Sequence, residues 1–246
     1  MVFFKVSNVL ALAAAVAAAP TELLQSRAVV NHDSINPVAE RIQTGGLGNV
    51  IKTFNPHLHI AHGCQPYPAV ADNGDTSGGL QDTGSSTGGC RDQSKGQTYA
   101  RAGTVDGKTV IMYSWYFPKD HPNSGDVAGG HRHDWENIVI QVDDPAAATP
   151  KIVAGAASSH SGYSKPRDGP VPPLEGDSPK VEYFTSFPTN HELQFTQTLG
   201  KTYPISDWDA LPQAAKTALQ DTDFGKANVP FKDGNFENKV REALAA

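Results

Sequence analysis

Runs of apolar and β-branched side chains in the second half of the chain predict strands. Residues 109–118 (TVIMYSWYFP) are apolar at both odd and even positions, which predicts a central strand covered on both faces. Residues 136–142 (ENIVIQV) predict a second strand. Three further strands are expected at residues 151–158, 180–187 and 191–198.

Helical spacing appears near both ends of the chain. Asn36 can cap a helix, Pro37 suits its first position, and Gly45 with Gly46 would end it, so a short helix is expected within residues 36–46. Apolar residues recur three and four positions apart later in the chain, which predicts helices at residues 209–220 and 235–244.

The predicted elements form one domain. Residues 160–179 are rich in Pro and Gly and predict a surface loop. The chain shows no internal repeat and no linker. We therefore expect an α+β fold, a mostly antiparallel β-sandwich with peripheral helices.

The first 19 residues have the features of a secretory signal peptide. Lys5 supplies a positive charge, and residues 9–19 (VLALAAAVAAA) are an apolar run too short to span a bilayer, with small residues that fit the cleavage rule. Residues 20–30 would be a short leader, which leaves residues 31–246 as the functional domain. We therefore expect a secreted protein that is soluble until it meets a membrane.

The chain contains two cysteines, Cys64 and Cys90. An even count in a secreted protein favours one disulfide. The bond would close a Gly- and Ser-rich loop that apolar packing could not hold alone, and it would contribute roughly 3 kcal/mol on the chain-entropy model.

Net charge restricts the partners. The formal net charge is −6, and removal of Lys5 with the signal peptide makes it one unit more negative. An acidic protein gains nothing from general attraction to nucleic acid or to anionic membranes, so no nucleic-acid partner is expected. Membrane binding would require specific recognition of lipid head groups, with a cation as a bridge.

Charged residues crowd at the start of the second predicted strand, in the sequence GGHRHDWENIVIQV. Strand alternation places Asp134 and Glu136 on the face that continues into the apolar core. Buried carboxylates are costly unless a cation compensates them, and His131 and Asp120 can reach the same end of the strand. Oxygen ligands favour Mg²⁺ or Ca²⁺, and added histidines would also suit Mn²⁺ or Zn²⁺.

Two other interpretations of local patterns stay open. Asp134 and Glu136 could instead pair with Arg132 or Lys119, or face water at a frayed strand end. The histidines of the sequence NPHLHIAHGC could hold zinc, but they lack an obvious second pair of ligands, so a structural role is favoured.

The heptapeptide GHRHDWE at residues 130–136, preceded by YSWYFPKD, resembles the signature of the necrosis- and ethylene-inducing-like protein (NLP) family in every position. Segments such as NGDTSGGL, TNHELQ and SDWDALPQAAKTAL extend the resemblance over about residues 31–244. The two cysteines are similar to those of the type 1 subgroup, which carries one disulfide.

The resemblance implies a fold similar to the actinoporin pore-forming toxins. It implies a non-enzymatic microbial cytolysin that damages eudicot plasma membranes and triggers necrosis and immune responses. The implied receptor is the plant sphingolipid glycosylinositol phosphorylceramide, bound through its terminal sugar beside a divalent cation, Mg²⁺ or Ca²⁺. Residues 111–135 resemble the pattern that plant immune receptors recognise in this family.

The resemblance also assigns roles at the cation site. Asp120 and Asp134 would bind the cation directly, and His131 and Glu136 would act largely through water molecules.

A second segment, SFPTNHEL, resembles the family's sugar-sensing loop, which points to Phe187, Asn190 and His191 as head-group residues. The family often has Trp and Asp where this chain has Phe187 and Asn190, which keeps a non-cytotoxic relative that retains only the immunogenic pattern as an alternative. A metal-dependent hydrolase of a sugar-phosphate lipid, with His131 or His133 as general base, is the enzyme alternative.

Overall fold

The computed structural model describes Met1 and residues 27–121, 130–186 and 191–246. Nearly all of the predicted signal peptide, residues 1–19, and most of the predicted leader, residues 20–30, lie outside these ranges and stay predictions. Among the described helices, none combines the length and the apolar character that crossing a bilayer requires.

A six-stranded sheet forms the centre of the molecule. Its strands follow the spatial order β12 (Ile205–Asp207), β4 (Thr98–Val105), β5 (Lys108–Asp120), β6 (His131–Val142), β7 (Ile152–Ser159) and β8 (Gly162–Ser164). Only β12 and β4 pair in parallel. The strands predicted at residues 109–118, 136–142 and 151–158 are confirmed, and β6 begins five residues earlier than predicted.

A smaller sheet packs against the large one. It has the order β11 (His191–Phe195), β10 (Ser178–Thr185) and β2 (His57–Ile60), with β9 (Leu174–Glu175) paired to β10. A parallel pair, β1 (Val29–Val30) with β3 (Thr76–Ser77), lies apart from both sheets. The surface loop predicted at residues 160–179 is wrong in part, because β8 and β9 lie inside it and are too short to show a period.

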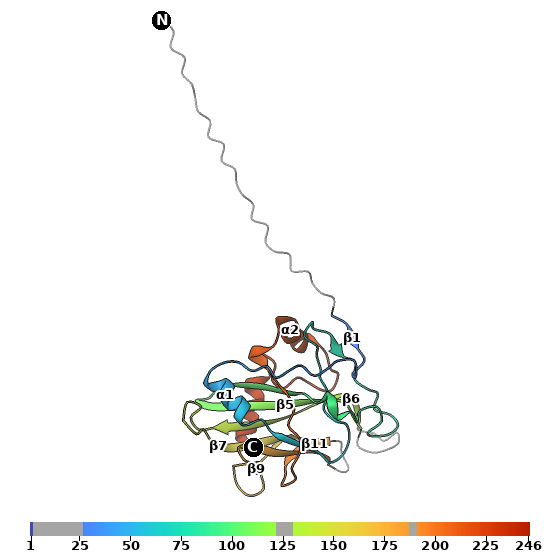
Figure 1. Cartoon of the computed structure of the whole chain (residues 1–246). Helices are drawn as coiled ribbons and strands as arrows, with labels where there is room; N and C mark the ends of the chain where they lie inside the picture. Colours follow the sequence, from blue (N-terminus) through green and yellow to red (C-terminus); the bar gives the residue numbers. More distant parts are fainter. Residues whose placement is uncertain (2–26, 122–129, 187–190) are drawn as a thin grey trace.

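Aromatic side chains fill both faces of β5. On the face toward the small sheet, Phe117 stacks on Tyr183 with ring centroids 3.8 Å apart. On the other face, Tyr116 packs against Phe224, and its neighbour Trp135 packs against Phe231. The central strand is therefore covered on both sides, as its sequence predicts. In Figure 1, α2 and β11 lie on opposite sides of β5 and β6.

The described residues form three α-helices at the periphery: α1 (Gly46–Thr53), α2 (Gln213–Asp221) and α3 (Phe236–Ala245). The last two confirm the helices predicted from apolar spacing. The same part of the chain also contains two short 3₁₀ turns, Gln93–Lys95 and Trp208–Ala210.

The helix predicted within residues 36–46 is wrong. Arg41 bridges Ser206 in parallel, and the backbone N–H of Gln43 donates to Asp207 Oδ2 at 3.0 Å. These contacts with the edge strand β12 hold the segment extended, so tertiary pairing overrides the local capping signals. The helix starts at Gly46, where the prediction had it stop.

The predicted disulfide between Cys64 and Cys90 is present. The loop that it closes folds over the end of β5. The backbone N–H of Leu80 donates to the Pro118 carbonyl, and the Lys119 ammonium donates to the Ser85 carbonyl at 2.8 Å. The resulting architecture is the mostly antiparallel sandwich with peripheral helices that the sequence predicts.

Candidate functional site

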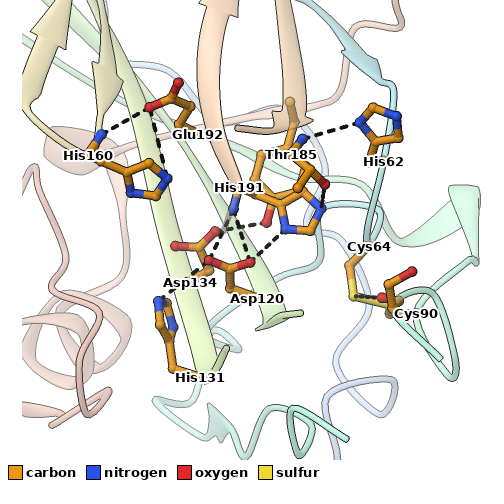
Figure 2. Close-up of polar contacts among 12 residues, drawn as sticks. His62, Cys64, Cys90, Asp120, His131, Asp134, His160, Thr185, His191 and Glu192 are labelled. Atoms are coloured by element: carbon orange, nitrogen blue, oxygen red, sulfur yellow. Dashed lines mark hydrogen bonds and ion pairs between the residues drawn. A yellow bond between two sulfur atoms is a disulfide. The ribbon is translucent and has the colours of Figure 1, made fainter. Parts of the chain in front are cut away.

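The ends of β5 and β6 bring together three of the predicted ligands. Asp120 lies directly opposite His131 in the antiparallel register. Ligand atoms of Asp120, His131 and Asp134 all lie within 4.8 Å of one another, and no other trio of this kind occurs in the described ranges. Figure 2 shows Asp120 between His131 and His191, with Asp134 beside it.

The first carboxylates of β6 are buried on the face that continues into the core. Asp134 lies opposite Phe117, and Glu136 lies opposite Trp115, so both share the face toward the small sheet. Only 6% of Asp134 and 8% of Glu136 is exposed. The strand-face prediction for this pair is therefore confirmed.

Burial and mutual repulsion oppose ionisation of these groups. Loss of water raises the pKa of Asp134 to about 7, with the charge of Asp120 as the next cause. Burial, followed by the charge of Asp134, raises the pKa of Glu136 well above its usual value. The Tyr183 hydroxyl donates to Asp134 Oδ2 at 2.9 Å, and the Ser158 hydroxyl donates to Glu136 Oε2.

Neighbouring basic residues do not neutralise the two carboxylates. The Lys119 ammonium donates to the carbonyls of Ser85 and Thr83, and the Arg132 guanidinium donates to the Gly78 carbonyl. Within the described part of the chain, no ion pair joins Lys119 or Arg132 to Asp134 or Glu136. A bound divalent cation would supply the missing positive charge, which is the chemistry that this donor set fits.

His191 lies against Asp120 and not at the surface. Its Nδ1 is 2.6 Å from Asp120 Oδ1, and its backbone N–H donates to the same carboxylate at 3.2 Å. Its ring stacks on Tyr183, its Nε2 is 3.2 Å from Thr185 Oγ1, and only 1% of its side chain is exposed. Phe187 and Asn190, the other predicted head-group residues, lie outside the described residues.

A cleft of about 380 Å³ opens beside the carboxylates. It runs from Asp120, His131 and Asp134 along β7 and β8 to α3. Tyr163, Lys226 and Lys239 also line it, and no local pattern in the sequence indicates any of these residues as part of a site. The arrangement can hold a cation at one end of a cleft wide enough for a sugar-sized ligand.

Comparisons with known proteins identify the family of the chain. Residues 48–243 match the model of the family described as NPP1, necrosis inducing protein. The chain is 48% identical to NLP effector protein 10 of Phytophthora capsici, over 88% of this chain and 92% of that one. It is 46% identical to the necrosis-inducing protein NPP1 of Phytophthora nicotianae, over 94% and 97% of the two chains.

Solved structures give the same result. The structure of NLPPya in complex with mannosamine has a TM-score of 0.81 at 46% identity and covers 88% of this chain and 99% of its own. The structure of the non-toxic HaNLP3 protein has a TM-score of 0.80 at 41% identity and covers 86% and 98%. With its single disulfide, the chain therefore belongs to the NPP1 family of necrosis-inducing proteins, in the type 1 group of NLP effectors.

Proposed function

We propose that this protein is a secreted cytolysin of plant cells. It binds the head group of glycosylinositol phosphorylceramide together with a divalent cation, Mg²⁺ or Ca²⁺, and permeabilises eudicot plasma membranes. Necrosis and immune responses follow from the membrane damage. The protein acts by binding and not by turnover, which agrees with relatives that are named as effectors and necrosis-inducing proteins.

The buried carboxylates are the observation that carries this proposal. Asp120 and Asp134 lie beside a cleft at the ends of paired strands, and no lysine or arginine of the described residues forms an ion pair with either. Two solved structures of one relative, NLPPya, are complexes with amino sugars, mannosamine and glucosamine. A cation held by carboxylates is a common partner for sugar hydroxyls and phosphoryl oxygens, because it keeps open coordination positions for oxygen ligands.

Each residue of the site would have a distinct role. Asp120 and Asp134 supply the direct oxygen ligands, and His131 and Glu136 orient coordinated water. His191 and Tyr183 donate hydrogen bonds to the two direct ligands and so fix their positions. The bound cation supplies positive charge to which an oxygen-rich head group can bind.

Dye release from lipid vesicles tests the proposal. Vesicles that contain plant glycosylinositol phosphorylceramide should leak when the protein is added, and vesicles of phosphatidylcholine alone should not. A chelator should stop the leakage, and added Ca²⁺ or Mg²⁺ should restore it. Equal leakage from both vesicle types, or leakage that the chelator does not change, would contradict the proposal, and steady release of free head group would indicate a hydrolase instead.

A second candidate is a non-cytotoxic relative that keeps only the immunogenic pattern. The observation that favours it is the similarity to the non-toxic HaNLP3 structure. Plant immune receptors would then respond to residues 111–135 without membrane damage. Infiltration of eudicot leaves separates the two functions, because the cytolysin causes tissue death, whereas the non-cytotoxic relative causes only an immune response that a synthetic peptide of residues 111–135 reproduces.

A further inference from the structure

His133 has an unusual backbone for a residue within a strand. Its φ is +63°, and among the described residues other than glycine only Asp106, with φ +49°, shares a left-handed backbone. Asp106 precedes Gly107 in the tight turn between β4 and β5, where such angles are normal. His133 lies inside β6, where a non-glycine residue with positive φ is rare and strained.

The left-handed backbone of His133 lies where the side chains of β6 depart from regular alternation between the two faces of the sheet. In a regular strand, His131 and Asp134 are three residues apart and point to opposite faces. Their ligand atoms nevertheless lie within 4.8 Å of each other and of Asp120. The left-handed residue between them interrupts the alternation, so both side chains can reach the same point.

The His133 ring is held in a closed slot. Its Nδ1 is 2.6 Å from the Tyr116 hydroxyl oxygen, and that hydroxyl donates its single hydrogen to Ser77 Oγ at 3.0 Å. The edge of Phe224 packs against the ring at 5.2 Å. A Cβ added to Gly79 would lie 2.8 Å from the ring, so only glycine fits there. These contacts favour one ring position and oppose relaxation of the strained backbone.

The same residue fixes the proton of His131. His131 Nδ1 is 2.6 Å from the backbone carbonyl of His133. A carbonyl oxygen only accepts hydrogen bonds, so a neutral His131 must carry its proton on Nδ1. The lone pair then lies on Nε2, the nitrogen that is 3.6 Å from Asp120 Oδ2.

We propose that His133 is a positioning residue for the cation site: its left-handed backbone turns His131 toward the carboxylates, and its carbonyl directs the Nε2 lone pair of His131 to the cation or to a water bound to it. The hydrogen bond between the Tyr116 hydroxyl and His133 Nδ1 stabilises this arrangement. The inference rests on the proposed cation site. It gives the second histidine of the heptapeptide a role that needs no contact with lipid.

Three variants test the proposal by titration calorimetry with Ca²⁺ and with Mg²⁺ in the absence of lipid. His133→Val, whose branched side chain opposes positive φ, should weaken cation binding tenfold or more. His133→Asn should recover part of the loss, because asparagine tolerates this backbone. Asp106→Val is the matched control: it places the same strain far from the site and should lower the melting temperature while cation affinity stays within twofold.

An affinity of His133→Val within twofold of the wild type, or a His133→Asn affinity no better than that of His133→Val, would overturn the proposal. If His133→Val does not fold, nitrogen NMR of the wild-type protein decides the question. Neutral His131 should be protonated on Nδ1, and protonation on Nε2 would overturn the proposal. A wild-type protein that binds neither cation, yet shows the Nδ1 proton, would refute the cation site and leave the positioning of His131 intact.

Discussion

Among the described residues, two groups of histidine and carboxylate side chains contrast in their burial. The buried cluster consists of Asp120, Asp134, His131 and His191. The open pair consists of His59 and Glu182 on the small sheet, with Nδ1 and Oε1 2.9 Å apart. In the buried cluster, His191 Nδ1 and Asp120 Oδ1 are a similar 2.6 Å apart. The side chains of His191 and Asp120 are each 1% exposed, whereas those of His59 and Glu182 are 33% and 15% exposed.

The difference shows what separates a cation site from an ordinary polar contact. Glu182 has local partners on both oxygens, because the Gln194 amide donates to Oε2 at 2.6 Å. Solvent also screens the open pair, so little charge there is left without compensation. In the buried cluster two carboxylates meet away from water, which raises the pKa of Asp134. Of the two groups, only the buried cluster should therefore be stabilised by a bound cation.

The largest expected effect comes from removal of one buried carboxylate. Asp134→Asn should lower the affinity for Ca²⁺ or Mg²⁺ roughly 1,000-fold, equivalent to about 4 kcal/mol, because a direct, desolvated ligand is lost. Leakage of vesicles should disappear while the fold remains, since the amide keeps the shape of the side chain. Calorimetry and dye release measure the two effects.

Glu182→Gln is the matched control in the open pair. It removes the carboxylate charge that lies 2.9 Å from His59, a distance similar to the 2.6 Å between His191 and Asp120 in the buried cluster. Cation affinity and leakage should stay within twofold of the wild type. A loss equal to that of Asp134→Asn would show that overall negative charge, and not the buried cluster, determines activity.

The disulfide should matter for the buried cluster more than for the open pair. Replacing both Cys64 and Cys90 with serine should lower the free energy of unfolding by roughly 3 kcal/mol, measured by urea denaturation. Lys119, the residue next to Asp120, donates a hydrogen bond to the Ser85 carbonyl in the loop that the disulfide closes. Cation affinity should therefore fall as well, and a variant that loses stability but binds cations normally would show that the loop does not support the site.

Cation removal should destabilise only a protein with an intact buried cluster. At a Ca²⁺ concentration 100 times the dissociation constant, bound cation should add about 2.7 kcal/mol to the free energy of unfolding. Thermal melts with and without a chelator measure the shift. The same comparison in Asp134→Asn should show almost no shift, and an equal shift in both proteins would indicate a cation bound elsewhere.

The smallest effect distinguishes the two histidines. His191→Ala removes a donor to Asp120, so the affinity for Ca²⁺ should fall roughly tenfold, as it does when outer partners of metal ligands are lost. His59→Ala should leave the affinity unchanged. If His191→Ala instead lowers lipid binding while the affinity for Ca²⁺ is kept, His191 contacts the head group and does not position Asp120.

Much of the fold follows from local sequence patterns. Apolar runs predict β5, β6 and β7, and helical spacing predicts α2 and α3, because long elements carry enough periodic positions. The helix predicted within residues 36–46 fails because contacts with β12, which is distant in sequence, hold that segment extended. Strands of two or three residues, such as β8 and β9, are fixed by their partners and carry no period of their own.

The site was partly predictable for the same reason. Alternation along β6 places Asp134 and Glu136 on the core face, and the heptapeptide adds His131. The burial of His191 against Asp120 depends on how the small sheet packs on the large one, which no local pattern encodes. The histidines of β2 and β6 are equally dense in sequence, and only the tertiary structure shows that His59 of β2 belongs to the open pair with Glu182.

Crystallography of the protein soaked with Mn²⁺, with anomalous scattering to locate the ion, shows directly whether the buried cluster binds a divalent cation. We expect one strong peak between Asp120 and Asp134, at roughly 2.0–2.6 Å from a carboxylate oxygen of each. A peak at His59 and Glu182, or no peak within the buried cluster at saturating Mn²⁺, would contradict this expectation.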